Sequence, residues 1–213
     1  MYSYLPTVVL ASAAIASLYG DDLAAFAALK AATTFSLVLL ALWQCRRHWS
    51  WTLVTFIAAL AFCLLGDIAL LESSRFVFGL ASFLLAHVLF IGLFLRWDQG
   101  QFRLLPAAMV FLLAGLFYVE ISAALAAMSY PVSIYTSVIA LMLAAAISLA
   151  LNDATNSAYQ IGIGAMLFAV SDGILAYNKF VENLPWADAA VLSSYWLALI
   201  FITLGCVQRI KSV

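Results

Sequence analysis

Long apolar segments separated by short polar connections run through the whole chain. A helix needs about 20 mostly apolar residues to cross the hydrocarbon core of a bilayer. Backbone groups in lipid must pair within their own segment, so such runs are helices rather than open strands. We predict spans over residues 5–20, 23–44, 49–71, 76–96, 103–119, 131–151, 157–178 and 186–207. The sequence therefore predicts an all-α, polytopic transmembrane bundle of eight helices in a single integral membrane domain, residues 1–213.

Composition excludes the main classes of soluble protein. Hydrophobic residues make up 67% of the chain and charged residues 9%, against about 45–50% and about 25% in soluble domains. With 9 basic and 10 acidic residues, the chain has no basic surface for nucleic acid. Cys45, Cys63 and Cys206 form no C-x-x-C pair, and we expect them to pack as small hydrophobes. The first segment is short, but its start lacks Lys and Arg, which favours a span over a signal peptide.

Basic residues in the predicted loops are divided unequally between the two sides of the bundle. The side with both termini carries Arg46, Arg47, Arg96, Arg103, Arg209 and Lys211. The other side carries only Arg75 and Lys179, with the acidic residues Asp21, Asp22, Glu72, Glu120, Glu182 and Asp188. Lys and Arg accumulate in cytoplasmic loops, so we predict that both termini are cytoplasmic. The short loops fit an organelle membrane as well as a bacterial inner membrane, and we expect the bacterial one.

Four ionisable residues lie inside predicted spans: Lys30, Asp67, His87 and Asp172. A charged group there costs about 2.5–3.5 kcal/mol on insertion scales and is typical of a functional site. With the predicted topology, these residues share the outer half of the bilayer with further polar side chains. Those helpers are Tyr135, Ser171, Asn178 and Tyr195. A shared depth favours one polar site, although depth alone does not show that the side chains face one another.

Structural interpretations of these residues stay open. Lys30 could extend its long side chain outward to the headgroup layer, and His87 could be a packing residue. One aspartate could pair with Lys30, but the other would then lack a partner. Asp67, His87 and Asp172 could also form a three-ligand metal site, which Glu72 could join, although we expect no metal and no cofactor.

Other functions also fit parts of the pattern. Two aspartates on spans occur in intramembrane aspartyl proteases, but Leu64 stands where the first glycine of their G-x-G-D motif would be. Intramembrane Asp, Lys and His are typical of proton relays, so a proton-coupled carrier or a non-catalytic lipid-binding protein is the main alternative. The four prolines lie at span ends, whereas carriers often have helices broken near the midplane.

Two motifs resemble the lysoplasmalogenase family of membrane proteins, also called YhhN-like. The first is GAMLFAVSDGILAYNKF, Gly164 to Phe180, and the second is GDIALLESSRFVFGLASFLLAH, Gly66 to His87. An intramembrane lysine at position 30 also fits, with Ala31 where the family usually has proline. Pro131 and Tyr135 fit as well, whereas Phe90 replaces a common tyrosine.

The resemblance implies an eight-helix enzyme that hydrolyses the vinyl-ether bond of lysoplasmalogens. The products are a fatty aldehyde and glycerophosphoethanolamine or glycerophosphocholine. By this resemblance Asp67 and Asp172 are the catalytic pair, and Lys30 and His87 belong to the polar site around them. We expect the substrate to be bound by Lys30, His87, Tyr135, Ser171, Asn178 and Tyr195. The expected partners are the lysophospholipid substrate and membrane lipid. The sequence leaves the oligomeric state and the headgroup preference open.

The expected chemistry suits two carboxyl groups. A vinyl ether becomes electrophilic only when an acid protonates its alkenyl carbon and forms an oxocarbenium ion. One proton donor and one anion meet that need, as in glycoside hydrolysis, where the transition state is similar. The sequence does not assign these two roles between Asp67 and Asp172.

Overall fold

The computed structural model describes residues 2–20, 22–99 and 101–212. Over these ranges the chain forms eight α-helices and three short 3-10 helices, without any strand. The α-helices are α1 (Leu5–Ser17), α2 (Leu23–Cys45), α3 (Trp51–Ala69), α4 (Phe76–Trp97), α5 (Leu104–Ser122), α6 (Ser129–Asp153), α7 (Asn156–Phe180) and α8 (Ala187–Lys211). The all-α prediction is confirmed, and each predicted span coincides with one helix to within four residues at either end.

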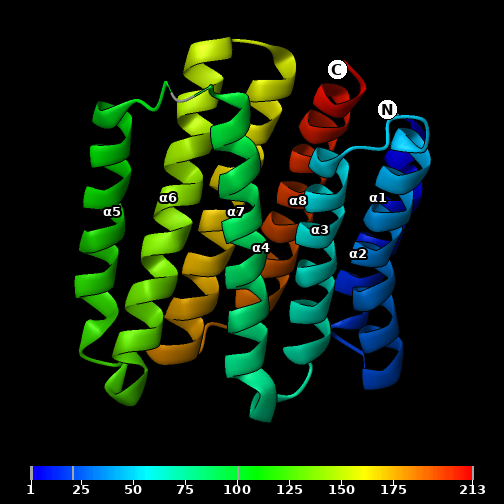
Figure 1. Ribbon diagram of the computed structural model, residues 1–213. Coiled ribbons are helices and arrows are strands. Elements are labelled where there is room, and N and C mark those ends of the chain that lie inside the picture. The colour runs from blue at the N-terminus through cyan, green and yellow to red at the C-terminus, as the bar shows by residue number, and fades with distance from the viewer. Residues whose placement is uncertain (1, 21, 100, 213) are drawn as a thin grey trace.

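The eight helices alternate in direction, so both termini lie at the same end of the bundle (Figure 1). We call this end the terminal end and the opposite end the distal end. The helix starts are set by short polar side chains. Asp22 begins α2 by accepting a hydrogen bond from the N–H of Ala25, and Ser50 caps α3 in the same way. Such caps satisfy backbone N–H groups that have no partner within the helix.

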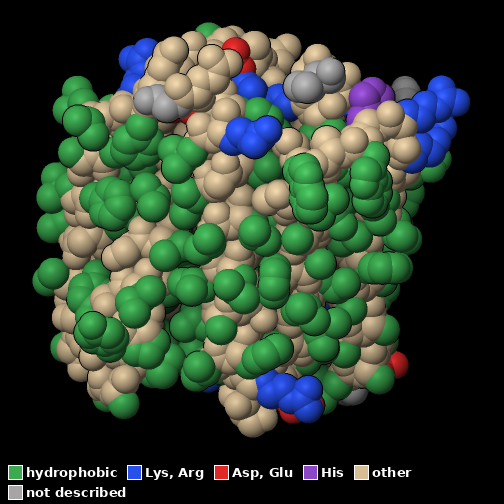
Figure 2. Space-filling model, viewed as in Figure 1, with side chains coloured by type: hydrophobic (Ala, Val, Ile, Leu, Met, Phe, Trp, Pro, Cys, Tyr) green, Lys and Arg blue, Asp and Glu red, His purple; other side chains and the backbone are tan. Residues whose placement is uncertain are grey.

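Seven of the helices, α2 to α8, are long and apolar enough to cross a membrane. Apolar side chains cover the visible sides of the molecule, whereas charged side chains gather at its two ends (Figure 2). The protein is therefore an integral, multi-pass membrane protein. Helix α1 has 13 residues, which span about 20 Å at 1.5 Å per residue, less than the hydrocarbon core of about 30 Å. The predicted span over 5–20 was too long because the helix ends at Ser17 and a turn follows.

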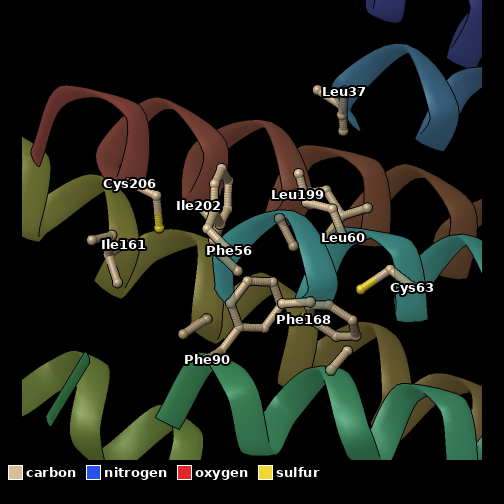
Figure 3. Close-up of a cluster of buried hydrophobic side chains, with 14 of the residues drawn as sticks. Leu37, Phe56, Leu60, Cys63, Phe90, Ile161, Phe168, Leu199, Ile202 and Cys206 are labelled. Atoms are coloured by element: carbon tan, nitrogen blue, oxygen red, sulfur yellow. The ribbon is translucent and has the colours of Figure 1, made fainter. Parts of the chain in front are cut away.

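Helices α7 and α8 pack most closely, because glycine lies at their contact points. A Cβ atom on Gly164 would lie 2.8 Å from the carbonyl oxygen of Ala198, and one on Gly205 would lie 2.4 Å from that of Ser157. Small residues of this kind let helix backbones approach within a membrane. Beside this pair, Phe56, Phe90 and Phe168 meet between α3, α4 and α7 (Figure 3). This core holds the elements of the candidate site in place.

Helix α5 lies at one edge of the bundle and packs along α6 (Figure 1). It is the least buried of the seven long helices. Its contact with α6 uses Ala107 and Val110 against Ala140 and Ala144. The side of α6 and α7 next to α5 is therefore not covered by a closely packed helix.

Candidate functional site

Asp67 lies near the distal end of α3 and is almost fully buried. Its Oδ2 accepts hydrogen bonds from the hydroxyl groups of Thr34, at 2.6 Å, and Tyr195, at 2.8 Å. The indole N–H of Trp196 donates to the same Thr34 hydroxyl at 3.3 Å. Lys30 lies one turn before Thr34 on α2, so the two residues share one face of that helix. Side chains from α2 and α8 thus meet at one carboxylate of α3.

Asp172 lies on α7 and is also buried, with 9% of its surface exposed. Its Oδ2 accepts a hydrogen bond from the hydroxyl of Tyr135 on α6 at 2.9 Å. Nε2 of His87 on α4 lies 3.7 Å from the same oxygen. Within the described part of the chain, neither ring nitrogen of His87 has a hydrogen-bond partner. Asp172 therefore accepts one hydrogen bond and lies near an imidazole that has no hydrogen-bond partner among the described residues, whereas Asp67 accepts two hydrogen bonds.

Aromatic rings fill the space around the two carboxylates. Phe168 lies edge-on to His87, with ring centroids 4.6 Å apart, and edge-on to Tyr195 at 5.4 Å. Phe83 contacts both Phe168 and Tyr195 in the same manner. A Cβ atom on Gly66 would lie 2.5 Å from the Phe83 ring, so glycine there lets Phe83 pack beside Asp67. The result is a rigid, apolar setting in which electrostatic interactions are strong.

A polar pocket of about 550 Å³ opens at the distal end of the bundle. Its charged and amide-bearing lining residues are Lys30, Glu72, Asn178, Lys179, Glu182, Asn183 and Asp188. Lys30 forms its inner part, since 7% of that residue is exposed. Two ammonium groups and three carboxylates in one pocket can bind a ligand that carries both charges.

An apolar groove of about 360 Å³ lies between α5, α6 and α7, with α4 closing its distal end. Asp172 and Tyr135 lie on its inner wall, and nearly all other lining side chains are apolar. At its rim, Leu113 of α5 is 65% exposed and Met166 of α7 is 52% exposed. The groove is therefore open on the side of the bundle that faces lipid, between α5 and α7.

The polar pocket and the apolar groove share three lining residues, Phe76, Leu175 and Phe180. The rings of Phe76 and Phe180 meet edge-on, with centroids 5.9 Å apart. The ammonium group of Lys179 lies 5.1 Å from the centroid of the Phe76 ring. One aromatic pair thus separates a charged, water-facing pocket from an apolar, lipid-facing groove.

The predicted site residues occupy different positions in this arrangement. Asp67 and Tyr195 come together on one side of the aromatic cluster, and His87, Tyr135 and Asp172 come together on the other. Lys30 lines the polar pocket. Ser171 turns away from both, and its hydroxyl donates to the carbonyl of Val191 on α8.

Asn178 lines the polar pocket, where its side-chain oxygen accepts a hydrogen bond from the N–H of Leu184. The distal loop residue Asp21 lies outside the described residues.

Several residues of the site were missing from the sequence prediction, and Thr34 and Phe168 illustrate two cases. Thr34 lies four residues after Lys30, and this spacing puts both on one helix face. Its polar side chain within a predicted span was the available signal. Phe168, one turn before Asp172, offered no such signal, because an aromatic residue in an apolar helix is ordinary.

The three-ligand metal arrangement is not formed. Among the described residues, no group of three or more His, Cys, Asp and Glu side chains is placed to hold a metal ion. Asp172 and His87 lie close to each other, but Asp67 is engaged by Thr34 and Tyr195 on the other side of the cluster.

Comparison with known proteins finds similarity over most of the chain. The YhhN family model matches residues 25–206. The chain is 28% identical over 158 residues to human "Lysoplasmalogenase TMEM86B", covering 70% of this chain and 62% of that protein. It is 32% identical over 147 residues to the pig TMEM86B protein, covering 68% and 60%. It is 31% identical over 160 residues to bovine "Lysoplasmalogenase TMEM86A", covering 72% and 65%. The chain thus spans about 60–65% of the length of these relatives. No solved structure matches it significantly.

Proposed function

Because the chain belongs to the YhhN family, we propose that it is a lysoplasmalogenase. It hydrolyses the vinyl-ether bond of a lysoplasmalogen to a fatty aldehyde and glycerophosphoethanolamine or glycerophosphocholine. The matched relatives bear that name. The observation that carries the proposal is Asp172 on the wall of an apolar groove that meets a polar pocket, with a second buried carboxylate, Asp67, on the other side of the aromatic cluster. An amphiphilic substrate with a reactive bond between head and chain fits that arrangement.

The reaction needs one proton donor and one stabilising anion. A carboxylic acid transfers its proton to the second carbon of the alkenyl chain, and the first carbon becomes part of an oxocarbenium ion. Water adds to that first carbon and gives a hemiacetal. The hemiacetal then loses the glycerol oxygen as a hydroxyl group and becomes the aldehyde. Water is consumed, and the proton given up by the acid is returned at the end.

We assign the proton donor to Asp172 and the anion to Asp67. Asp172 lines the groove and accepts a single hydrogen bond, from Tyr135, and a buried carboxyl group with few partners favours the protonated form. Asp67 accepts two hydrogen bonds, from Thr34 and Tyr195, and hydrogen bonds donated to a carboxylate favour the charged form. A fixed negative charge beside the site stabilises a developing oxocarbenium ion.

The headgroup binds in the polar pocket. The ammonium groups of Lys30 and Lys179 provide partners for the phosphate, and Glu72, Glu182 and Asp188 provide partners for the ethanolamine or choline cation. Asn178 lies on the same pocket wall. His87 lies close to Asp172, and we place it, with Tyr135 and Tyr195, among the residues that position the carboxyl groups. The hydroxyl of Ser171 donates a hydrogen bond to α8 and so helps to hold α7, which carries Asp172, against α8.

The chain works as one domain with both termini in the cytoplasm of a bacterial cell. The terminal end carries six Lys and Arg residues against two at the distal end, the asymmetry expected for a cytoplasmic side. This orientation requires α1 to cross the membrane and places the polar pocket at the outer leaflet. Reporter fusions test this orientation. If a reporter that works only in the cytoplasm is active when inserted in the Lys179 loop, the topology is the reverse of the one proposed.

Aldehyde release from a defined lysoplasmalogen tests the function. We expect release by the wild-type protein, and a fall in kcat of about 100-fold or more for Asp67→Asn and Asp172→Asn, the range of a lost acid or of a lost stabilising charge. Asp98→Asn is the matched control. Asp98 is another buried aspartate, but at the terminal end, where Ser148 and Asn152 donate to it. Folded wild-type protein that releases no aldehyde would refute the proposal, as would full activity in either site variant.

A further inference from the structure

We propose that the apolar groove between α5, α6 and α7 is the binding site of the substrate's alkenyl chain. The chain reaches the groove sideways from the bilayer, between α5 and α7. This inference rests on the proposed function and adds the path and the site of the hydrocarbon chain. The occupant is one chain of one lysolipid, whose headgroup lies in the polar pocket.

The groove is open toward the lipid-facing side of the bundle. Its rim residues Leu113, Met166 and Val170 are exposed by 65%, 52% and 49%. Its inner wall, which includes Tyr135 and Asp172, is buried. In a membrane, this surface faces lipid chains rather than water. A hydrocarbon chain can therefore move from the bilayer into the groove without crossing a polar layer.

The groove is about as long as one lipid chain. Along α6 its lining extends from Val132 to Leu143, a rise of about 17 Å at 1.5 Å per residue. One leaflet contributes about half of the 30 Å hydrocarbon core. The groove therefore runs from the headgroup level to about the middle of the membrane, as one lipid chain does.

The groove is continuous with the polar pocket. Phe76 and Phe180 line both the pocket and the groove. Asp172 lies two turns of α7 from Phe180, about 12 Å toward the membrane centre. The linkage between head and chain of a lipid seated in both cavities would pass this aromatic pair. The glycerol backbone then lies at the aromatic pair, and the vinyl ether that follows it enters the groove toward Tyr135 and Asp172 on the inner wall.

The expected energetics differ from those of an apolar pocket in water. Lipid chains are as apolar as the groove, so moving a chain from bilayer to groove changes its transfer free energy little. Binding strength must then come from the polar pocket, and the groove sets the position of the reacting carbon. Narrowing the groove should therefore affect long chains much more than short chains.

Chain-length selectivity is the first test. Ala114 of α5 lines the groove, whereas Ala108 of the same helix faces outward and does not line it. We expect Ala114→Phe to lower kcat/KM for a long-chain lysoplasmalogen about tenfold relative to a short-chain one, the factor that overpacking of a contact produces. Ala108→Phe should leave the ratio unchanged. Equal ratios in the two variants, with aldehyde release intact, would overturn the groove assignment while the proposed function stands.

A photoreactive lipid gives a second test that does not depend on turnover. The probe is a lysophospholipid with a saturated ether-linked chain and a diazirine at the chain end, which this reaction cannot cleave. We expect labelling of groove residues on α5, α6 or α7 of the wild-type protein, reduced by excess unlabelled ether lysolipid. Labelling spread over the lipid-facing surface without such competition would overturn the inference. Competed labelling of the groove without aldehyde release would support the groove and refute the proposed hydrolysis.

Discussion

Removal of the Tyr135 hydroxyl tests the role of Asp172 as the acid. This hydroxyl donates to Asp172 at 2.9 Å, and Tyr135→Phe deletes the donor while keeping the ring, whose centroid lies 5.6 Å from that of His87. A hydrogen bond between neutral groups contributes about 0.5–1.5 kcal/mol, and one to a charged group about 1.5–3 kcal/mol. When Asp172 gives up its proton it becomes charged, so the bond strengthens in the transition state by about 1–1.5 kcal/mol.

That difference predicts a fall in kcat of about tenfold for Tyr135→Phe. The KM should change little, because the group acts on the carboxyl and not on the headgroup. The assay is the rate of aldehyde release at several substrate concentrations, with the melting temperature measured on the same sample.

Tyr118→Phe is the control for this measurement. Tyr118 also loses a hydrogen bond, to the carbonyl of Ser129 at 3.1 Å, but it lines neither cavity. An unchanged kcat in Tyr135→Phe, or an equal fall in Tyr118→Phe, would refute the reasoning.

Three further substitutions give separate tests. Gly164→Ala should lower the melting temperature, because the new Cβ would clash with the α8 backbone at a cost of about 1–3 kcal/mol. The control is Gly115→Ala, which has no atom within 4 Å of its Cβ position and should keep the wild-type melting temperature. Equal melting temperatures in the two variants would contradict the packing argument. Lys30→Gln should raise KM for the lysolipid about tenfold through the lost charged contact, and an unchanged KM would remove Lys30 from headgroup binding. Thr34→Val should lower kcat less than Asp67→Asn does, because the Tyr195 hydroxyl still donates to the carboxylate; a loss equal to that of Asp67→Asn would assign Thr34 a larger role.

The helices of this protein could be predicted from the sequence because the bilayer imposes the length of each apolar segment. The first segment is the exception, since apolar residues continue to Tyr19 after α1 has ended at Ser17. Hydropathy measures how well residues tolerate lipid and does not show where the backbone turns.

The depth of the polar residues could also be predicted, but their partners could not. Ser171 and Asp172 have the same predicted depth, yet neighbours on a helix point about 100° apart. Ser171 therefore contacts α8 while Asp172 faces the groove. The bond from Tyr195 to Asp67 joins residues 128 positions apart in the chain, and only the packing of α3 against α8 brings them together.

The junction at Phe76 and Phe180 has a consequence for the fate of the products. On the proposed function, the bond is cut at Asp172, inside the groove and on the lipid side of its junction with the water-facing pocket. The aldehyde is left on the lipid side and dissolves in the bilayer, whereas the glycerophospho compound is left on the water side and diffuses away. Because the aldehyde enters the bilayer and the glycerophospho compound enters water, the reverse reaction would require both products to return to the site at the same time. The partition of the products between membrane and water would thus make the cleavage practically one-way without any coupled source of energy.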